Sequence, residues 1–209
     1  MPTLLMHLIV GLFIFLSPTP APPAPQPPAA VVAAAPAEVA TYQIDTVHSE
    51  LSFRIRHLMG RVFGTFTDWE GTLTVDPADL TTTAVDVTVR TASILTLNEQ
   101  RDAHLRTPDF FAAEEYPTMT FTSDRVVQDG DRIEVHGDLT IRGTTRPVVL
   151  TGEYRGQGPD PWGNERIAFL ASTTIDRHDF GVSYNQLVEG VGMIGDEVEI
   201  TIAIEAVRQ

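Results

Sequence analysis

The sequence contains no cysteine and no lysine among its 209 residues. Without cysteine the chain can form neither a disulfide nor a lipoprotein attachment site, which is compatible with an exported compartment without proving one. All 14 basic side chains are therefore arginine, and 28 acidic side chains bring the net charge to −14. Because nucleic acids and anionic lipids bind basic surfaces, this charge makes both of them poor partners.

Charged residues are also missing from the first part of the chain. No acidic residue precedes Glu38 and no basic residue precedes Arg54, while residues 4–16 are almost wholly apolar. Thirteen apolar residues are fewer than the roughly 20 that span a bilayer, and they match the hydrophobic region of a secretory signal. We expect residues 1–17 to hold this signal region and the protein to be periplasmic or otherwise exported. Because basic residues before the region are missing, an uncleaved anchor remains the alternative; if the signal is cleaved, no integral membrane segment is left.

Proline and alanine dominate the next segment. Residues 18–36 hold eight of the 15 prolines in the chain, a composition that cannot build a core and predicts a semi-rigid, extended linker. We place this linker at residues 18–40, including small-residue cleavage sites near Ala34 and Ala37. Residues 41–209 then form one domain of ordinary size, roughly 100–200 residues.

Apolar and polar residues alternate through most of this domain. Leu51, Phe53 and Ile55 share one face of residues 49–58, a period of two that predicts a half-buried strand. The same pattern predicts strands within residues 41–47, 69–76, 84–91, 118–127, 132–143, 147–154, 166–176 and 197–207. Asp129-Gly130 is a good signal for a short hairpin between two of these strands.

Only residues 97–116 break the alternation. Asn98 is suited to cap a short helix that runs to about Arg106, and Pro108 ends it because the residue before proline disfavours helical geometry. We therefore predict an all-β fold, a closed or nearly closed antiparallel barrel of eight strands with one short helical insert. A two-sheet sandwich would show the same alternation and remains the competing architecture.

Several short motifs point to catalysis or cofactor binding, but each lacks the context it needs. Residues 190–195, GVGMIG, match a dinucleotide fingerprint, yet a strand is expected after them where the motif requires a helix; we predict a loop before the last strand. The pair His48-Ser49 has no nucleophile elbow around it, and we expect the histidine to hold strand ends together by hydrogen bonds. A metal site remains a minor alternative with few clustered ligands, drawn from His57, His104, His136 and His178 with Asp102, Asp109 or Asp179.

A series of motifs in a fixed order resembles the YceI-like family. The matching pieces are Tyr42-x-Ile44-Asp45, Val47-His48-Ser49, Phe53-x-Ile55-x-His57, VFGTF at 62–66, Ser93-Ile94, RDAHLRTPDFF at 101–111, YPTMTF-x-S at 116–123, GDLTIRGTTRPV at 137–148, IDR-x-DFG at 175–181 and GDEV at 195–198. The resemblance implies a lipocalin-like barrel with an apolar tunnel and a polyisoprenoid or other long lipid tail as ligand. It also implies export to the periplasm and a homodimer.

A lipid tail agrees with the residues available, because each buried CH₂ contributes about 0.8 kcal/mol without any polar anchor. We expect the ligand to contact a set of apolar residues, each of which taken alone would pass as a core residue. The set comprises Phe53, Ile55, Phe66, Trp69, Leu105, Phe110, Phe111, Met119, Phe121, Leu139, Ile141 and Phe180. No catalytic residue, metal or cofactor is expected beside the bound lipid.

The stretches RDAHLRTPDFF and IDRHDFG share arginine, aspartate, histidine and phenylalanine. We expect Arg101, Asp102, Arg177 and Asp179 to tie the insert to one mouth of the barrel through charge-assisted bonds. Arg101, Asp102, Arg177 or His104 would then meet a polar head group or belong to a lid, since guanidinium matches phosphate well.

Two classes of function follow from these observations. The first is an exported, non-enzymatic binding protein that carries a polyisoprenoid, an isoprenoid quinone or a similar long-chain amphiphile. The second is a barrel enzyme that acts on such a lipid with His48, His57 or His104 as acid or base. A sandwich domain for protein contact is the third reading, and the absence of a continuous cavity would favour it.

Overall fold

The computed structural model describes residues 39–188 and 190–209, so the predicted signal segment and nearly all of the linker lie outside the described residues. The strands are β1 (Ala40–Ile44), β2 (Glu50–His57), β3 (Gly60–Phe66), β4 (Trp69–Asp76), β5 (Asp79–Arg90), β6 (Ile94–Leu95), β7 (Thr118–Asp129), β8 (Arg132–Ile141), β9 (Thr144–Pro159), β10 (Glu165–Asp176), β11 (Leu187–Val188), β12 (Val191–Gly192) and β13 (Ile194–Arg208). The helix α1 spans Glu99–Leu105, and two 3-10 helices span Thr91–Ser93 and Arg177–Phe180. In the part of the chain that is described, no helix is both long and apolar enough to cross a bilayer.

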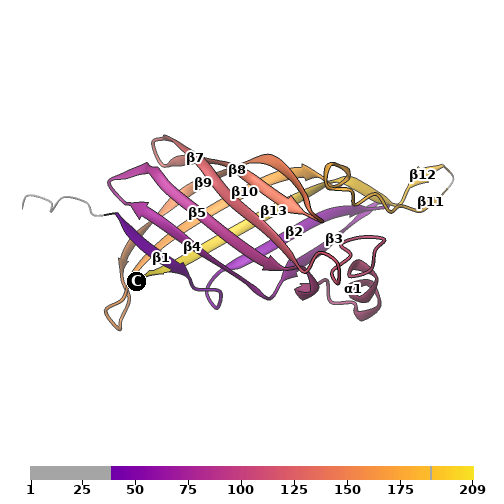
Figure 1. The fold of residues 1–209 in the computed structure, drawn as a ribbon, viewed down its shortest axis with the longest axis horizontal. Helices are drawn as coiled ribbons and strands as arrows, with labels where there is room; N and C mark the ends of the chain where they lie inside the picture. The colour runs from indigo at the N-terminus through magenta and orange to yellow at the C-terminus, as the bar shows by residue number, and fades with distance from the viewer. Residues whose placement is uncertain (1–38, 189) are drawn as a thin grey trace, which may run out of the picture. The chain divides into compact units, whose positions relative to one another are not determined.

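Eight of these strands close into a ring. They pair in the order β1, β4, β5, β7, β8, β9, β10 and β13, and β1 pairs back with β13. All the pairs are antiparallel, as the ribbon in Figure 1 shows. The predicted eight-stranded barrel is confirmed, and the sandwich is excluded because a sandwich would leave the ring open.

The last strand, β13, joins the two ends of the sheet. One edge of it pairs with β10, from Glu197 opposite Asp176 to Val207 opposite Arg166. The other edge is shared, because β2 pairs near its start and β1 pairs at its end. Strands β3 and β6 extend the sheet outward from β2. We call the two ends of the barrel the α1 end, where β13 begins, and the β1 end, where it finishes (Figure 1).

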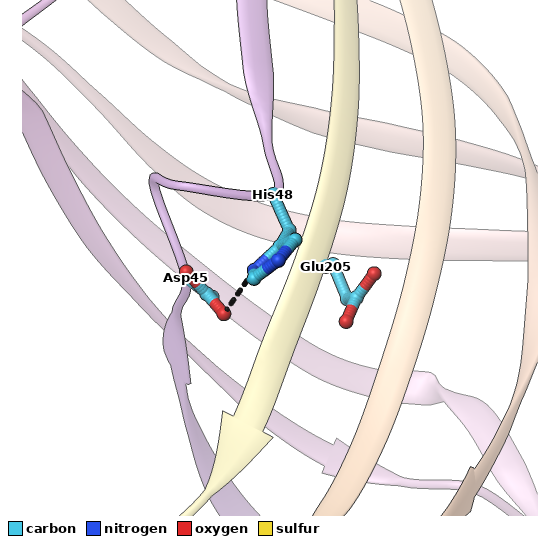
Figure 2. Close-up of side chains that lie close together, drawn as sticks. All are labelled: Asp45, His48 and Glu205. Carbon is cyan, nitrogen blue, oxygen red and sulfur yellow. Dashed lines mark hydrogen bonds and ion pairs between the residues drawn. The ribbon is translucent and has the colours of Figure 1, made fainter. Parts of the chain in front are cut away.

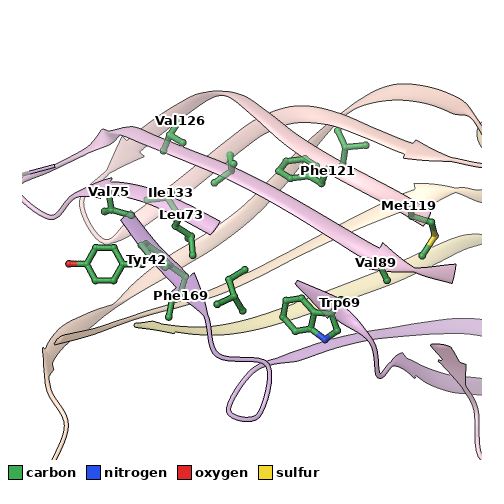
Figure 3. Close-up of a cluster of buried hydrophobic side chains, with 14 of the residues drawn as sticks. Tyr42, Trp69, Leu73, Val75, Val89, Met119, Phe121, Val126, Ile133 and Phe169 are labelled. Atoms are coloured by element: carbon green, nitrogen blue, oxygen red, sulfur yellow. The ribbon is translucent and has the colours of Figure 1, made fainter. Parts of the chain in front are cut away.

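Alternating side chains line the interior of the ring. Along β4 the buried residues are Trp69, Gly71, Leu73 and Val75, each separated by a more exposed neighbour. Figure 3 shows Trp69, Leu73 and Val75 pointing into the interior together with labelled residues of β7, β8 and β10. The described residues, 39–188 and 190–209, belong to one compact unit, so this part of the chain contains the complete barrel.

The helical insert follows its predicted bounds closely. Asn98 caps α1, because its side chain accepts a hydrogen bond of 2.9 Å from the backbone N–H of Arg101. The helix ends at Leu105, and the chain turns at Thr107, whose backbone N–H donates to the carbonyl of His104 at 3.0 Å. The loop predicted at residues 190–195 is wrong in one respect, since β12 pairs there with β11 in a small hairpin. The strand β13 follows it directly, so no helix exists to complete a dinucleotide site.

Gly152 of β9 lies opposite Ala171 of β10, where the strand pair leaves no room for a side chain. A Cβ atom at Gly152 would lie 2.3 Å from the backbone oxygen of Leu170. We expect Gly152→Ala to lower the free energy of unfolding by about 1–3 kcal/mol, because the strands must move apart. Gly158→Ala in the same strand is the matched control, since nothing lies within 4 Å of a Cβ there. Thermal unfolding followed by circular dichroism measures both, and equal melting temperatures would contradict the prediction.

Candidate ligand cavity

The barrel encloses a cavity of about 480 Å³, within the range of roughly 300–1,000 Å³ for small-molecule sites. Its wall is formed mainly by apolar side chains from the barrel strands and from the insert. Every apolar residue predicted to face a ligand lies on this wall, namely Phe53, Ile55, Phe66, Trp69, Leu105, Phe110, Phe111, Met119, Phe121, Leu139, Ile141 and Phe180. Contact between these residues and a ligand stays a prediction.

Polar side chains of the wall gather at the α1 end. They come from the end of β2, from α1 and from the segment before β11, and they are Arg56, His57, Arg101, His104, Tyr184 and Gln186, with Arg177 close to the same segment. Along the rest of the cavity the polar groups are hydroxyls, from Ser52, Thr83, Thr120 and Thr173. The cavity therefore suits an amphiphile whose apolar chain runs along the barrel and whose polar group points to the α1 end.

Aromatic rings pack the insert against the α1 end of the cavity. The rings of His104, Phe110 and Tyr184 lie about one another with each pair of centroids 5.0 Å apart. His104 Nε2 lies 2.8 Å from a carboxylate oxygen of Asp109. Deeper in the barrel, the ring of Phe111 meets that of Phe66 edge-on at 6.0 Å. The insert thus covers this end with its phenylalanine rings facing the cavity.

Arg142, in the turn between β8 and β9, fastens the insert to the barrel. Its Nη1 donates to the carbonyl oxygens of Phe110 at 2.8 Å and Gly181 at 2.9 Å. Sequence reasoning missed this residue, because an arginine beside a glycine in a hairpin turn has the pattern of a solvated charge. The only available signal was its place in the motif GDLTIRG.

The predicted tie between Arg101, Asp102, Arg177 and Asp179 is wrong. Among the described residues no hydrogen bond or ion pair joins the first two of these residues to the last two. Asp102 is buried and accepts instead from the backbone N–H of Thr96 at 2.8 Å and from its hydroxyl. Arg101 donates to the hydroxyl and carbonyl oxygens of the same threonine, each at 2.6 Å. Both charges therefore hold α1 to the segment that follows β6.

Arg177 is buried and holds the segment before β11. Its Nε donates to the carbonyl of Gly195 at 2.8 Å, and its Nη1 donates to the carbonyls of Val182 at 2.6 Å and Tyr184 at 3.0 Å. Burial lowers the pKa of the guanidinium from its ordinary value, while the carboxylate of Asp196, 3.8 Å away, opposes this effect. Most N–H donors of Arg177 therefore already bond to backbone carbonyls of the protein.

An ionic cluster stands at the β1 end (Figure 2). Asp45, His48 and Glu205 bring possible metal-ligand atoms within 4.8 Å of one another. Arg166, however, donates from Nη1 to Asp45 at 2.8 Å and to Glu205 at 2.5 Å, and from Nε to Asp160 at 2.9 Å. Its hydrogen bond, followed by that of His48, lowers the pKa of Asp45 from 3.8 to about 2. The guanidinium is the cation that these carboxylates surround, so the donor set fits a metal ion poorly.

The five histidines of the described residues do not assemble a catalytic or metal-binding group. His57 and His104 line the cavity, whereas His48 lies at the β1 end with its Nδ1 2.8 Å from Asp45. Beside it, the hydroxyl of Ser49 donates to the carbonyl of Glu205 and accepts from its backbone N–H. The prediction that His48 holds strand ends together is confirmed. The histidines of the predicted metal set do not come together. His104, His136 and His178 contact three different carboxylates, those of Asp109, Glu134 and Asp176.

The protein is thus an antiparallel β-barrel with an apolar cavity. The polar side chains of the cavity lie at the end that α1 covers. The YceI-like domain model matches residues 42–206. The protein YceI of Escherichia coli O157:H7 is 40% identical over 180 residues, which cover 85% of this chain and 92% of that protein. The chain therefore belongs to the YceI-like family.

Solved structures agree with this assignment. The YceI protein of Campylobacter jejuni is 34% identical, with a TM-score of 0.66 over 74% of this chain and 90% of that one. Two more distant structures share the fold. Burkholderia cenocepacia BcnA has a TM-score of 0.70 at 23% identity, covering 78% of this chain and 98% of that one. A polyisoprenoid binding domain from Saccharophagus degradans has a TM-score of 0.60 at 15% identity, covering 82% and 100%.

The cluster around Arg166 makes the stability of the barrel depend on pH. The pKa of Asp45 is lowered to about 2 in the folded state. Its contribution to the free energy of unfolding is therefore complete above pH 3.8 and is lost as the pH falls toward 2. We expect Arg166→Gln to lower the melting temperature at pH 7, since three carboxylates lose their partner, and this deficit should shrink between pH 4 and 2. Arg155→Gln, which breaks an exposed pair with Glu153, is the control and should change little. A deficit that stays constant with pH would contradict the assignment.

Proposed function

We propose that the protein is a non-enzymatic carrier that encloses one long-chain amphiphile in its barrel. The observation that carries this proposal is the cavity, which runs inside a closed barrel and is lined almost entirely by apolar side chains. Membership of the YceI-like family supports it, as does the name of the structurally similar polyisoprenoid binding domain. A polyisoprenoid, an isoprenoid quinone or a similar lipid is the ligand class that fits.

The energetics of burial support an apolar chain as the main source of affinity. Each CH₂ transferred from water contributes about 0.8 kcal/mol, so ten of them supply about 8 kcal/mol, equivalent to a dissociation constant near 1 μM. Ordering of the chain and loss of its free motion reduce this value. A polar anchor is therefore needed only to orient the ligand, and a cavity with polar groups at one end is sufficient.

We place the polar end of the ligand beside α1, near His104, Tyr184 and Gln186. These side chains line the cavity at the end where its polar groups gather. Arg101 and Arg177 lie near the same end, but their hydrogen bonds go to the protein itself. We further propose that the carrier works after export, in accord with the apolar residues 4–16 and the absence of cysteine.

Extraction of freshly expressed protein into organic solvent, followed by mass spectrometry, tests the proposal directly. We expect a long-chain amphiphile in an amount comparable to that of the protein. Protein that yields no lipid, although it is folded and was purified without detergent, would contradict the carrier function.

Two adjacent residues of β9 provide a matched pair of variants. Leu150 lines the cavity, whereas Val149 is exposed on the outer face. We expect Leu150→Trp to reduce the extracted lipid several-fold, because the indole occupies space along the chain, and Val149→Trp to leave it unchanged. The melting temperature of each lipid-free variant checks the fold. Equal lipid contents in the two variants would place the ligand outside the cavity.

A further inference from the structure

Four apolar side chains at the α1 end are exposed although the cavity opens beside them. Leu58 and Met59 form the turn between β2 and β3, Leu97 precedes α1, and Leu187 begins β11. Their exposed fractions are 44%, 106%, 88% and 72%. We call these four residues the apolar rim. Figure 1 shows the β11–β12 hairpin projecting from the same end of the barrel as α1.

Backbone hydrogen bonds connect the rim to the wall of the cavity. The N–H of Leu58 donates to the carbonyl of Met193 at 2.7 Å, and the N–H of Met193 donates to the carbonyl of Gln186 at 2.9 Å. Met193 and Gln186 both line the cavity. Leu97 lies next to Asn98, the cap of α1, whose later residues also line the cavity. The apolar rim thus adjoins the wall of the cavity at Met193 and Gln186.

Two of the rim leucines occupy strained backbone conformations. Leu58 has a φ of 52° and Leu97 a φ of 60°, in the left-handed region that glycine and asparagine adopt far more readily than leucine. A turn selected for stability alone would carry one of those two residues, so the leucine side chains oppose the local preference and expose apolar surface as well. Strain of this kind at an exposed site points to a function for the side chain itself.

We propose that the apolar rim docks on the surface of a lipid bilayer and that the ligand passes between bilayer and barrel there. This inference rests on the proposed carrier function, because a long-chain ligand resides in bilayers and each CH₂ that crosses water opposes the transfer. The rim residues stand on separate projecting turns around an opening, which suits insertion between lipid head groups better than the broad, flat contact of two proteins. Because the net charge is −14, the contact is apolar and does not need anionic lipid.

Sedimentation with phosphatidylcholine vesicles tests the docking. Residues 36–209 are used, because they hold the complete barrel and lack the apolar residues 4–16. We expect the wild-type protein to bind and the variant Leu58→Asn, Met59→Ser, Leu97→Asn, Leu187→Ser to bind at least about tenfold more weakly, a difference of about 1.4 kcal/mol. Asparagine accepts a positive φ, so this variant should melt no lower than the wild type.

The exposed Trp162 provides the control, because it lies in the turn between β9 and β10 at the opposite end of the barrel. Trp162→Ser should bind vesicles as the wild type does, and its co-purified lipid should move into them at the wild-type rate, whereas the rim variant should transfer it at least about tenfold more slowly. Binding that strengthens when phosphatidylglycerol is added would assign the contact to arginines and overturn the apolar rim. The docking would also be overturned if the wild-type protein were a dimer and the rim variant a monomer, with vesicle binding the same in both.

Failure of the docking and failure of the carrier function are separable. A wild-type protein that yields lipid on extraction but stays in the supernatant with vesicles would overturn the docking and leave the carrier function intact. A protein that yields no lipid and takes none up from vesicles would overturn the carrier function, and with it the reason for the docking.

Discussion

The hydrogen bonding of β13 is the constraint on which the rest of the molecule depends. This strand pairs with β10 along one edge and with both β1 and β2 along the other, so it converts an open sheet into a ring. The turn between β1 and β2 must therefore stay against β13, and Ser49 bonds there to both backbone groups of Glu205. With the ring closed, each strand has one face that cannot reach solvent, and the alternation of the sequence becomes a wall around a cavity.

The two ends of the barrel are held by different kinds of interactions. At the β1 end, small and aromatic side chains meet closely, as Val75 and Ala206 show by their complete burial, and carboxylates surround Arg166 outside. At the α1 end, the insert covers an opening through aromatic rings and through arginine bonds to backbone carbonyls. The polar side chains of the cavity wall lie at the α1 end, near α1 and the segment before β11.

The sequence predicted the barrel and its inward residues because a period of two, such as Leu51, Phe53 and Ile55, is a local signal that closure does not alter. It also located α1, whose cap at Asn98 depends on neighbours in the chain. What it could not predict were contacts set by the closed ring. Arg142, for example, reaches the carbonyls of Phe110 and Gly181 in two distant segments. The strand β3 was not predicted, because its glycines interrupt the alternation. Its pairing with β2 defines it.

The absence of lysine acquires a structural meaning in the same contacts. Arg106 bridges the carbonyls of Ala92 and Ile94, and Arg142 bridges two segments in the same way. The planar guanidinium presents several donors in a fixed fork, whereas an ammonium acts as a compact point charge without that geometry. Carbonyl oxygens are neutral, so these bonds hold the insert without placing a second charge beside an apolar cavity. Arginine thus allows the α1 end to be fastened by polar contacts while the wall behind it stays suited to a hydrocarbon chain.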